Sequence, residues 1–138
     1  MKKDWSPVLL SVLRIVVAFL YIQHGTAKWF AFPAAVMPGG GVVPVGSLFW
    51  FAAVIETVGG LLFLFGLFTR PVAFILAGEM AFAYFMIHAG RGFWPLVNQG
   101  EPAVFFCFTF LYFAAAGAGP WSLDALLARR RSSAVPVL

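Results

Sequence analysis

Residues 46–68 read GSLFWFAAVIETVGGLLFLFGLF, and Glu56 is the one charged side chain in this apolar run. About 20 helical residues cross the ~30 Å hydrocarbon core of a bilayer, because each residue of a helix adds about 1.5 Å. A lone carboxyl group in such a run is expensive to bury and therefore indicates a functional or structural partner. The run predicts a membrane-spanning helix that carries a polar group.

Three other apolar runs have a similar length, at about residues 7–30, 72–88 and 102–118. Proline and glycine interrupt the chain between the first two runs, in the stretch FPAAVMPGGG at residues 32–41. Both residue types break helices, so this stretch predicts a loop. We expect an all-α integral membrane protein, a four-helix bundle of up-down topology that forms a single transmembrane domain over residues 1–138. The first run is expected to remain as a membrane span and not to be cleaved as a signal peptide.

The composition excludes several classes of protein. Of the 138 residues 62% are hydrophobic and 10% are charged, more apolar surface than a water-soluble domain of this length can bury. The net charge is +4, but the basic residues lie at the ends of the apolar runs, so we expect no nucleic-acid partner. Cys107 is the single cysteine, which excludes an intramolecular disulfide and a CxxC pair.

Basic residues gather on one side of the predicted membrane. An even number of spans places both termini together, and this side holds Lys2, Lys3, Arg70, Arg129, Arg130 and Arg131. The positive-inside rule then predicts a multi-pass protein of the inner (plasma) membrane with both termini and a basic tail, residues 125–138, in the cytoplasm. Residues 126–131 are interpreted as a stop-transfer charge cluster or as a segment along the anionic inner surface, before a disordered tail at Ser132-Ser133.

Three ionisable side chains fall inside the predicted spans, at Arg14, Glu56 and Glu79. Each costs about 2.5 to 3.5 kcal/mol at the centre of a bilayer, so each requires a partner or a function. Arg14 and Glu79 both lie about 10 to 12 Å above the cytoplasmic start of their spans. We therefore predict an Arg14–Glu79 ion pair, with Glu56 as a competing partner. Such a pair can also serve only to fix the helix register.

The outer half of the predicted bundle holds further polar residues, namely His24, Lys28, His88, Arg91 and Glu101. Arg14, Tyr21, Gly25 and Lys28 share one face of the first span, which we expect to point into the bundle. Two histidines on different spans form no recognised ligand motif, so we expect neither a metal site nor a haem. No cofactor is evident, and a quinone is the class that this cluster can accommodate.

Several short motifs resemble those of the DoxX family of small four-helix membrane proteins. They are His24-Gly25 with Lys28, Glu56 with Gly59-Gly60, Gly66 with Thr69-Arg70, Gly100-Glu101 and residues 117–124, GAGPWSLD. The resemblance covers about residues 8–124. It implies a multi-pass inner-membrane protein linked to membrane redox systems, since the family takes its name from a subunit of a thiosulfate:quinone oxidoreductase.

Three functions are consistent with these features. The chain is a subunit or accessory factor of a membrane redox system, and its polar cluster at His24, Lys28, Glu56 and Glu101 binds a quinone head group or a small anion. Alternatively, the polar side chains inside the predicted bundle form a column that serves proton or small-solute transport: Arg14, Glu79, Glu56, His24 and Lys28. The transport protein would be a homo-oligomer assembled through the stripe of Ala73, Ala77 and Ala81. The third alternative is a non-catalytic assembly scaffold. A stand-alone enzyme is not expected, because no nucleophile with an adjacent base and no cofactor fingerprint is present.

Overall fold

The computed structural model describes residues 4–133, and every regular element in that part of the chain is a helix. Ten helical elements follow one another along it: α1 Ser6–Phe30, α2 Leu48–Val54, η1 Ile55–Gly59, α3 Gly60–Phe65, α4 Thr69–Ala83, η2 Tyr84–His88, η3 Ala89–Arg91, α5 Pro95–Asn98, α6 Glu101–Ala116 and α7 Leu123–Ser133. The elements η1 and η2 are single turns of π-helix that continue α2 and α4 without a break. The all-helical prediction is confirmed.

Three continuous helical segments are long and apolar enough to cross a membrane: Ser6–Phe30, Leu48–Phe65 and Thr69–Arg91. They correspond to the first three predicted spans. The fourth predicted span, residues 102–118, is the apolar helix α6, which has 16 residues and a length of about 24 Å. This helix is shorter than the ~30 Å hydrocarbon core.

The third segment begins at Thr69, three residues before the predicted start at residue 72, and the reason is local. Pro71 occupies the first turn of α4, where a backbone N–H has no partner within the helix and proline is therefore tolerated. The free N–H groups of Phe68 and Thr69 instead donate to the two carboxylate oxygens of Asp124, at 2.8 and 2.9 Å. A side chain distant in sequence thus caps α4.

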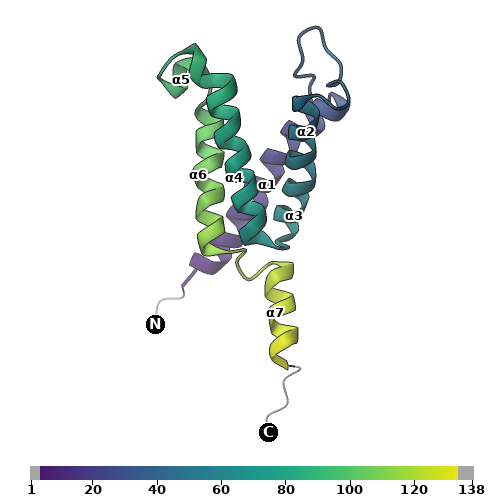
Figure 1. The fold of residues 1–138 in the computed structure, drawn as a ribbon. Helices are drawn as coiled ribbons and strands as arrows, with labels where there is room; N and C mark the ends of the chain where they lie inside the picture. Colours follow the sequence, from purple (N-terminus) through teal and green to yellow (C-terminus); the bar gives the residue numbers. More distant parts are fainter. Residues whose placement is uncertain (1–3, 134–138) are drawn as a thin grey trace.

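The segments form two helix pairs that diverge toward one end (Figure 1). α1 packs along α2, η1 and α3, and α4 packs along α6. We call the end where α3 and α6 finish and α7 begins the basal end, and the end that carries the start of α2 and α5 the distal end. The two pairs meet at the basal end and separate toward the distal end, where α2 and α4 lie apart.

The core between the pairs is aromatic. Tyr21, Phe63, Phe110 and Phe113 are fully buried. The rings of Tyr21 and Phe110 lie 4.8 Å apart, those of Phe63 and Phe110 5.1 Å, and those of Phe63 and Phe113 5.0 Å, each pair meeting edge to face. These rings connect α1, α3 and α6 in one layer.

The alanine stripe on α4 belongs to this core. Ala73 and Ala77 are buried within the chain, in the cluster that also holds Phe106 and Phe110 of α6. Their small side chains let α4 and α6 approach closely. The prediction that this stripe forms an oligomer interface is therefore wrong for Ala73 and Ala77, whereas Ala81 is half-buried. A homo-oligomer itself stays a prediction.

The basic C-terminal segment is helical. α7 runs through Ser132 and Ser133, so the predicted disorder at these serines is wrong. The hydroxyl groups of both serines donate to the carbonyl oxygen of Arg129, which extends the helix by local bonds. α7 projects from the basal end of the bundle (Figure 1). Lys2, Lys3 and the rest of the predicted tail, residues 134–138, lie outside the described residues.

Removal of the Asp124 cap should destabilise the basal end. We expect Asp124→Ala to lower the free energy of unfolding by about 1 to 2 kcal/mol, the usual cost of a lost helix cap. Asp124→Asn keeps one acceptor oxygen and should cost less. Unfolding of the detergent-solubilised protein, followed by circular dichroism, measures both. An Asp124→Ala protein as stable as the parent would contradict the capping role.

Candidate functional site

Arg14 lies at the basal end and binds backbone oxygens only. Its Nε donates to the carbonyl of Ala118 at 3.0 Å, Nη2 donates to that of Trp121 at 2.6 Å, and Nη1 donates to those of Phe63, at 2.6 Å, and Leu64. Arg14 is 1% exposed. The predicted ion pair with Glu79 is therefore wrong, and the competing pair with Glu56 does not form either.

The reason is the end of α3. Carbonyl groups in the last turn of a helix have no partner within it and carry partial negative charge, so they attract a cation. Gly66 ends α3 with a left-handed backbone at φ +65°, and a Cβ atom there would lie 3.0 Å from the Arg14 guanidinium carbon. The chain turns closely around Arg14, whose guanidinium group donates hydrogen bonds to the carbonyl groups at the end of α3 and in the segment that follows α6.

Lys28 and Glu56 form an ion pair between α1 and η1. Lys28 Nζ lies 2.6 Å from each carboxylate oxygen of Glu56. The Glu56 side chain is 3% exposed and that of Lys28 15% exposed. Glu56 therefore faces protein, and its partner is the lysine on the polar face of α1.

Gly25 permits this pairing, one turn before Lys28. A Cβ atom at Gly25 would lie 2.9 Å from the backbone nitrogen of Thr57 and 3.0 Å from the carbonyl oxygen of Ala53. Only glycine therefore lets α1 approach the π-turn that carries Glu56. π-Turns inside α-helices frequently occur at functional sites.

Glu79 has a different partner. The hydroxyl group of Tyr21 donates to Glu79 Oε2 at 2.6 Å and joins α1 to α4. Tyr21 was predicted on the polar face of the first span but was not included among the candidate site residues. Its position on the same helical face as Arg14 and Lys28 indicates that Tyr21 points into the bundle.

A cavity of about 400 Å³ opens between the two diverging helix pairs. We call it the cleft. α1 contributes its floor, α2 and η1 one wall, and α4, η2 and α6 the other. Its lining is mainly apolar, with six polar side chains: His24, Lys28, Glu56, Glu79, His88 and Gln99. The structure thus brings five of the eight candidate residues together.

The two histidines have separate surroundings in the cleft. His24 meets the ring of Phe106 edge to face at 5.7 Å. His88 Nδ1 lies 3.0 Å from the carbonyl oxygen of Asn98 and its ring stacks on Tyr84. Within residues 4–133 no group of three or more His, Cys, Asp or Glu side chains is arranged to hold a metal ion.

Asn98 is a buried polar residue that the sequence interpretation missed. Its Nδ2 donates to the carbonyl oxygen of Gly92 at 2.8 Å, and its Oδ1 accepts from the N–H of Gly100 at 2.8 Å. These bonds fix the segment between η3 and α6. Because this segment also binds His88, Asn98 shapes the distal rim of the cleft.

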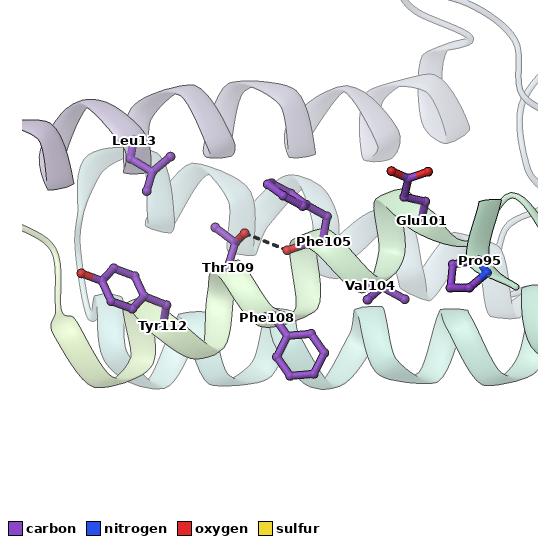
Figure 2. Close-up of a pocket in the computed structure, with 8 residues that line it drawn as sticks. All are labelled: Leu13, Pro95, Glu101, Val104, Phe105, Phe108, Thr109 and Tyr112. Atoms are coloured by element: carbon purple, nitrogen blue, oxygen red, sulfur yellow. Dashed lines mark hydrogen bonds between the residues drawn. The ribbon is translucent and has the colours of Figure 1, made fainter.

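Glu101 and Arg91 lie away from the cleft. Glu101 lines a second, lateral groove of about 530 Å³, with Leu13, Pro95, Val104, Phe105, Phe108, Thr109 and Tyr112 (Figure 2). The helical period explains this position, because Pro102, Ala103 and Phe106 turn the other side of α6 toward the cleft. Arg91 is exposed at the end of η3. The prediction that Glu101 belongs to one polar cluster with His24, Lys28 and Glu56 is therefore wrong.

Comparison with known proteins agrees with the resemblance in the motifs. The family model of DoxX matches residues 9–89, more than half of the chain. The chain belongs to the DoxX family. The matched part runs from within α1 through η2 and contains Arg14, Lys28, Glu56 and Glu79.

Two relatives of this DoxX-family chain are uncharacterized. One, from Haemophilus influenzae, is 50% identical over 125 residues, which cover 88% of this chain and 92% of the relative. The other, an uncharacterized membrane protein of Mycobacterium tuberculosis, is 26% identical over 142 residues, 93% of this chain and 86% of the relative. No solved structure matches the chain.

Most of the DoxX-like motifs lie at two places in the fold. Gly66, Arg70 and residues 117–124 meet at the basal end, where Arg70 donates to the carbonyl groups of Ala114 and Ala115 at the end of α6. Lys28 and Glu56 line the cleft, and Gly25 lets α1 approach η1 beside them. The first group holds helix ends together, so the second group is the candidate functional site.

Proposed function

We propose that the cleft binds the head group of a membrane quinone and that the chain is a subunit or accessory factor of a membrane redox system. The observation that carries the proposal is the buried Lys28–Glu56 pair beside Glu79 in a cavity of about 400 Å³. This volume falls in the range of small-molecule sites, about 300 to 1,000 Å³. Such sites combine apolar walls with a few polar groups that orient the ligand.

The lining suits a ring that carries oxygen atoms. Phe49, Phe51, Phe82 and Phe106 offer aromatic contacts, and Lys28 and Glu79 offer polar ones. A small anion suits the cleft less well, because Glu56 already neutralises the charge of Lys28. Electrons would come from a redox partner protein, since the cleft contributes binding and proton-exchanging groups.

The aromatic core supports binding from one side over transport. Tyr21, Phe63, Phe110 and Phe113 are fully buried between the level of Lys28 on α1 and that of Arg14. Close-packed rings leave a proton or solute no polar route from the cleft to the basal end. A scaffold role predicts that the cleft binds nothing, which the experiment below tests.

The same proposal includes the setting in the membrane. We infer four spans in up-down order, with α6 as a short fourth span that tilting of its neighbours or local thinning of the bilayer accommodates. Arg70 and Arg129–Arg131 lie on or beyond the basal end, which the positive-inside rule assigns to the cytoplasm. This orientation, in the inner membrane, opens the cleft toward the outer leaflet.

Filling part of the cleft should weaken ligand binding. Ala83 lines the cleft, so Ala83→Phe would occupy part of its volume without a change of charge. We expect the Kd for a short-chain ubiquinone, measured on protein in lipid nanodiscs, to rise at least about tenfold, a loss of about 1.4 kcal/mol. Val104→Phe is the matched control, because Val104 lines the lateral groove instead.

Two results would contradict the proposal. One is a parent protein that shows no saturable binding of either the ubiquinone or a naphthoquinone of similar size. The other is an Ala83→Phe protein that binds as the parent does while Val104→Phe loses binding. Unfolding curves of both variants establish that each comparison is made on folded protein.

A further inference from the structure

The two carboxyl groups that line the cleft, the buried one of Glu56 and the half-buried one of Glu79, are not equivalent. Both oxygens of Glu56 lie 2.6 Å from Lys28 Nζ, so that side chain has a full countercharge. Glu79 Oε2 accepts a hydrogen bond from the neutral hydroxyl group of Tyr21. Within the described part of the chain no basic side chain forms an ion pair with Glu79.

The groups around Glu79 can be named element by element. α1 presents Tyr21, His24 and Lys28, and η1 presents Glu56. α6 presents apolar side chains, Ala103 and Phe106. The one lysine is held by Glu56, so an ionised Glu79 would add a second negative charge to a site that has a single positive one.

An uncompensated carboxylate at this depth is costly. Insertion of an ionised acid at the centre of a membrane helix costs about 2.5 to 3.5 kcal/mol, and a buried group without a countercharge takes up a proton instead. A protonated carboxyl group is both donor and acceptor. Because Oε2 already accepts the hydrogen bond from Tyr21, the acid proton would lie on Oε1. Within residues 4–133 no side chain or backbone group accepts a hydrogen bond from Oε1.

We infer that Glu79 is a protonated acid in the empty cleft, held in place by Tyr21, and that its Oε1–H donates a hydrogen bond to a carbonyl oxygen of a neutral ligand. This inference rests on the proposed function and names the group that contacts the ligand. It specifies a carbonyl compound without charge, such as a quinone, over a carboxylate or an amine. Tyr21 is a positioning residue, because it acts through Glu79.

Infrared difference spectroscopy of the protein in nanodiscs at neutral pH tests the inference. A protonated carboxyl group has a C=O stretching band that an ionised one lacks. We expect this band in the ligand-free parent protein, its loss in Glu79→Gln, and its retention in Glu101→Gln. Tyr21→Phe should keep the band and move it to higher frequency, because one hydrogen bond to the acid is lost.

Addition of the short-chain ubiquinone should move the same band to lower frequency, because Oε1–H then donates to the ligand. A parent protein without the band, or a band that Glu79→Gln keeps, would overturn the inference. These outcomes differ from failure of the proposed function. If quinone binds to a protein that lacks the band, only the protonated state of Glu79 is refuted. If quinone binds and the band does not shift, the contact between Glu79 and the ligand is refuted.

Discussion

Arg14→Met should lower the free energy of unfolding by at least about 3 to 5 kcal/mol, the range for removal of one partner from a buried charged interaction. The guanidinium group donates to four carbonyl oxygens at the end of α3 and in the segment after α6. Each buried carbonyl left without a donor costs about 1 to 3 kcal/mol. A domain is stable by only about 5 to 15 kcal/mol, so this loss is a large fraction of the total stability.

Arg70→Met is the matched control for this effect. Arg70 also donates to carbonyl groups at a helix end, those of Ala114 and Ala115, but its side chain is exposed. Water replaces an exposed donor at little cost, and we expect a loss below about 1 kcal/mol. Arg14→Lys should fall between the two variants, because an ammonium group lacks the planar fork of donors. Equal stability of Arg14→Met and Arg70→Met would contradict the role assigned to Arg14.

The contrast between Arg14 and Glu56 shows what the sequence can predict. The first three membrane-length runs, the loop at residues 32–41 and the inward face of α1 follow from composition and helical period alone, and the structure confirms them. Depth along each span correctly indicates that Arg14 must have a partner. Depth does not reveal its identity, because the partners are backbone carbonyl groups exposed by a helix end that sequence does not locate.

Partners within the cleft were harder to predict for a second reason. Lys28 and Glu56 meet because Gly25 lets two backbones approach, which depends on how α1 and η1 pack. Glu101 turns away from the cleft because α6 rotates it toward the lateral groove (Figure 2). Candidate residues can therefore be chosen by type and depth, whereas their pairing depends on the rotation of each helix about its axis.

Lys28→Met should destabilise the protein strongly, and a second substitution should restore much of the loss. Methionine at residue 28 leaves the Glu56 side chain, 3% exposed, without its cation. Loss of one partner of a buried ion pair costs about 3 to 5 kcal/mol, whereas replacement of both by apolar residues of similar volume is often neutral. We expect Lys28→Met/Glu56→Leu to be more stable than Lys28→Met.

The four proteins of this double-mutant cycle, compared by unfolding in detergent, isolate the energy of the pair. Hydrogen bonds between membrane helices average about 0.6 kcal/mol in such cycles. The coupling here should exceed that average, because both partners are charged and Lys28 Nζ contacts both oxygens of Glu56. A coupling near zero, with the double variant no more stable than Lys28→Met, would mean that Glu56 is neutral in the folded protein. The ion pair would then be absent, and the cleft would contain two protonated acids, Glu56 and Glu79, beside Lys28.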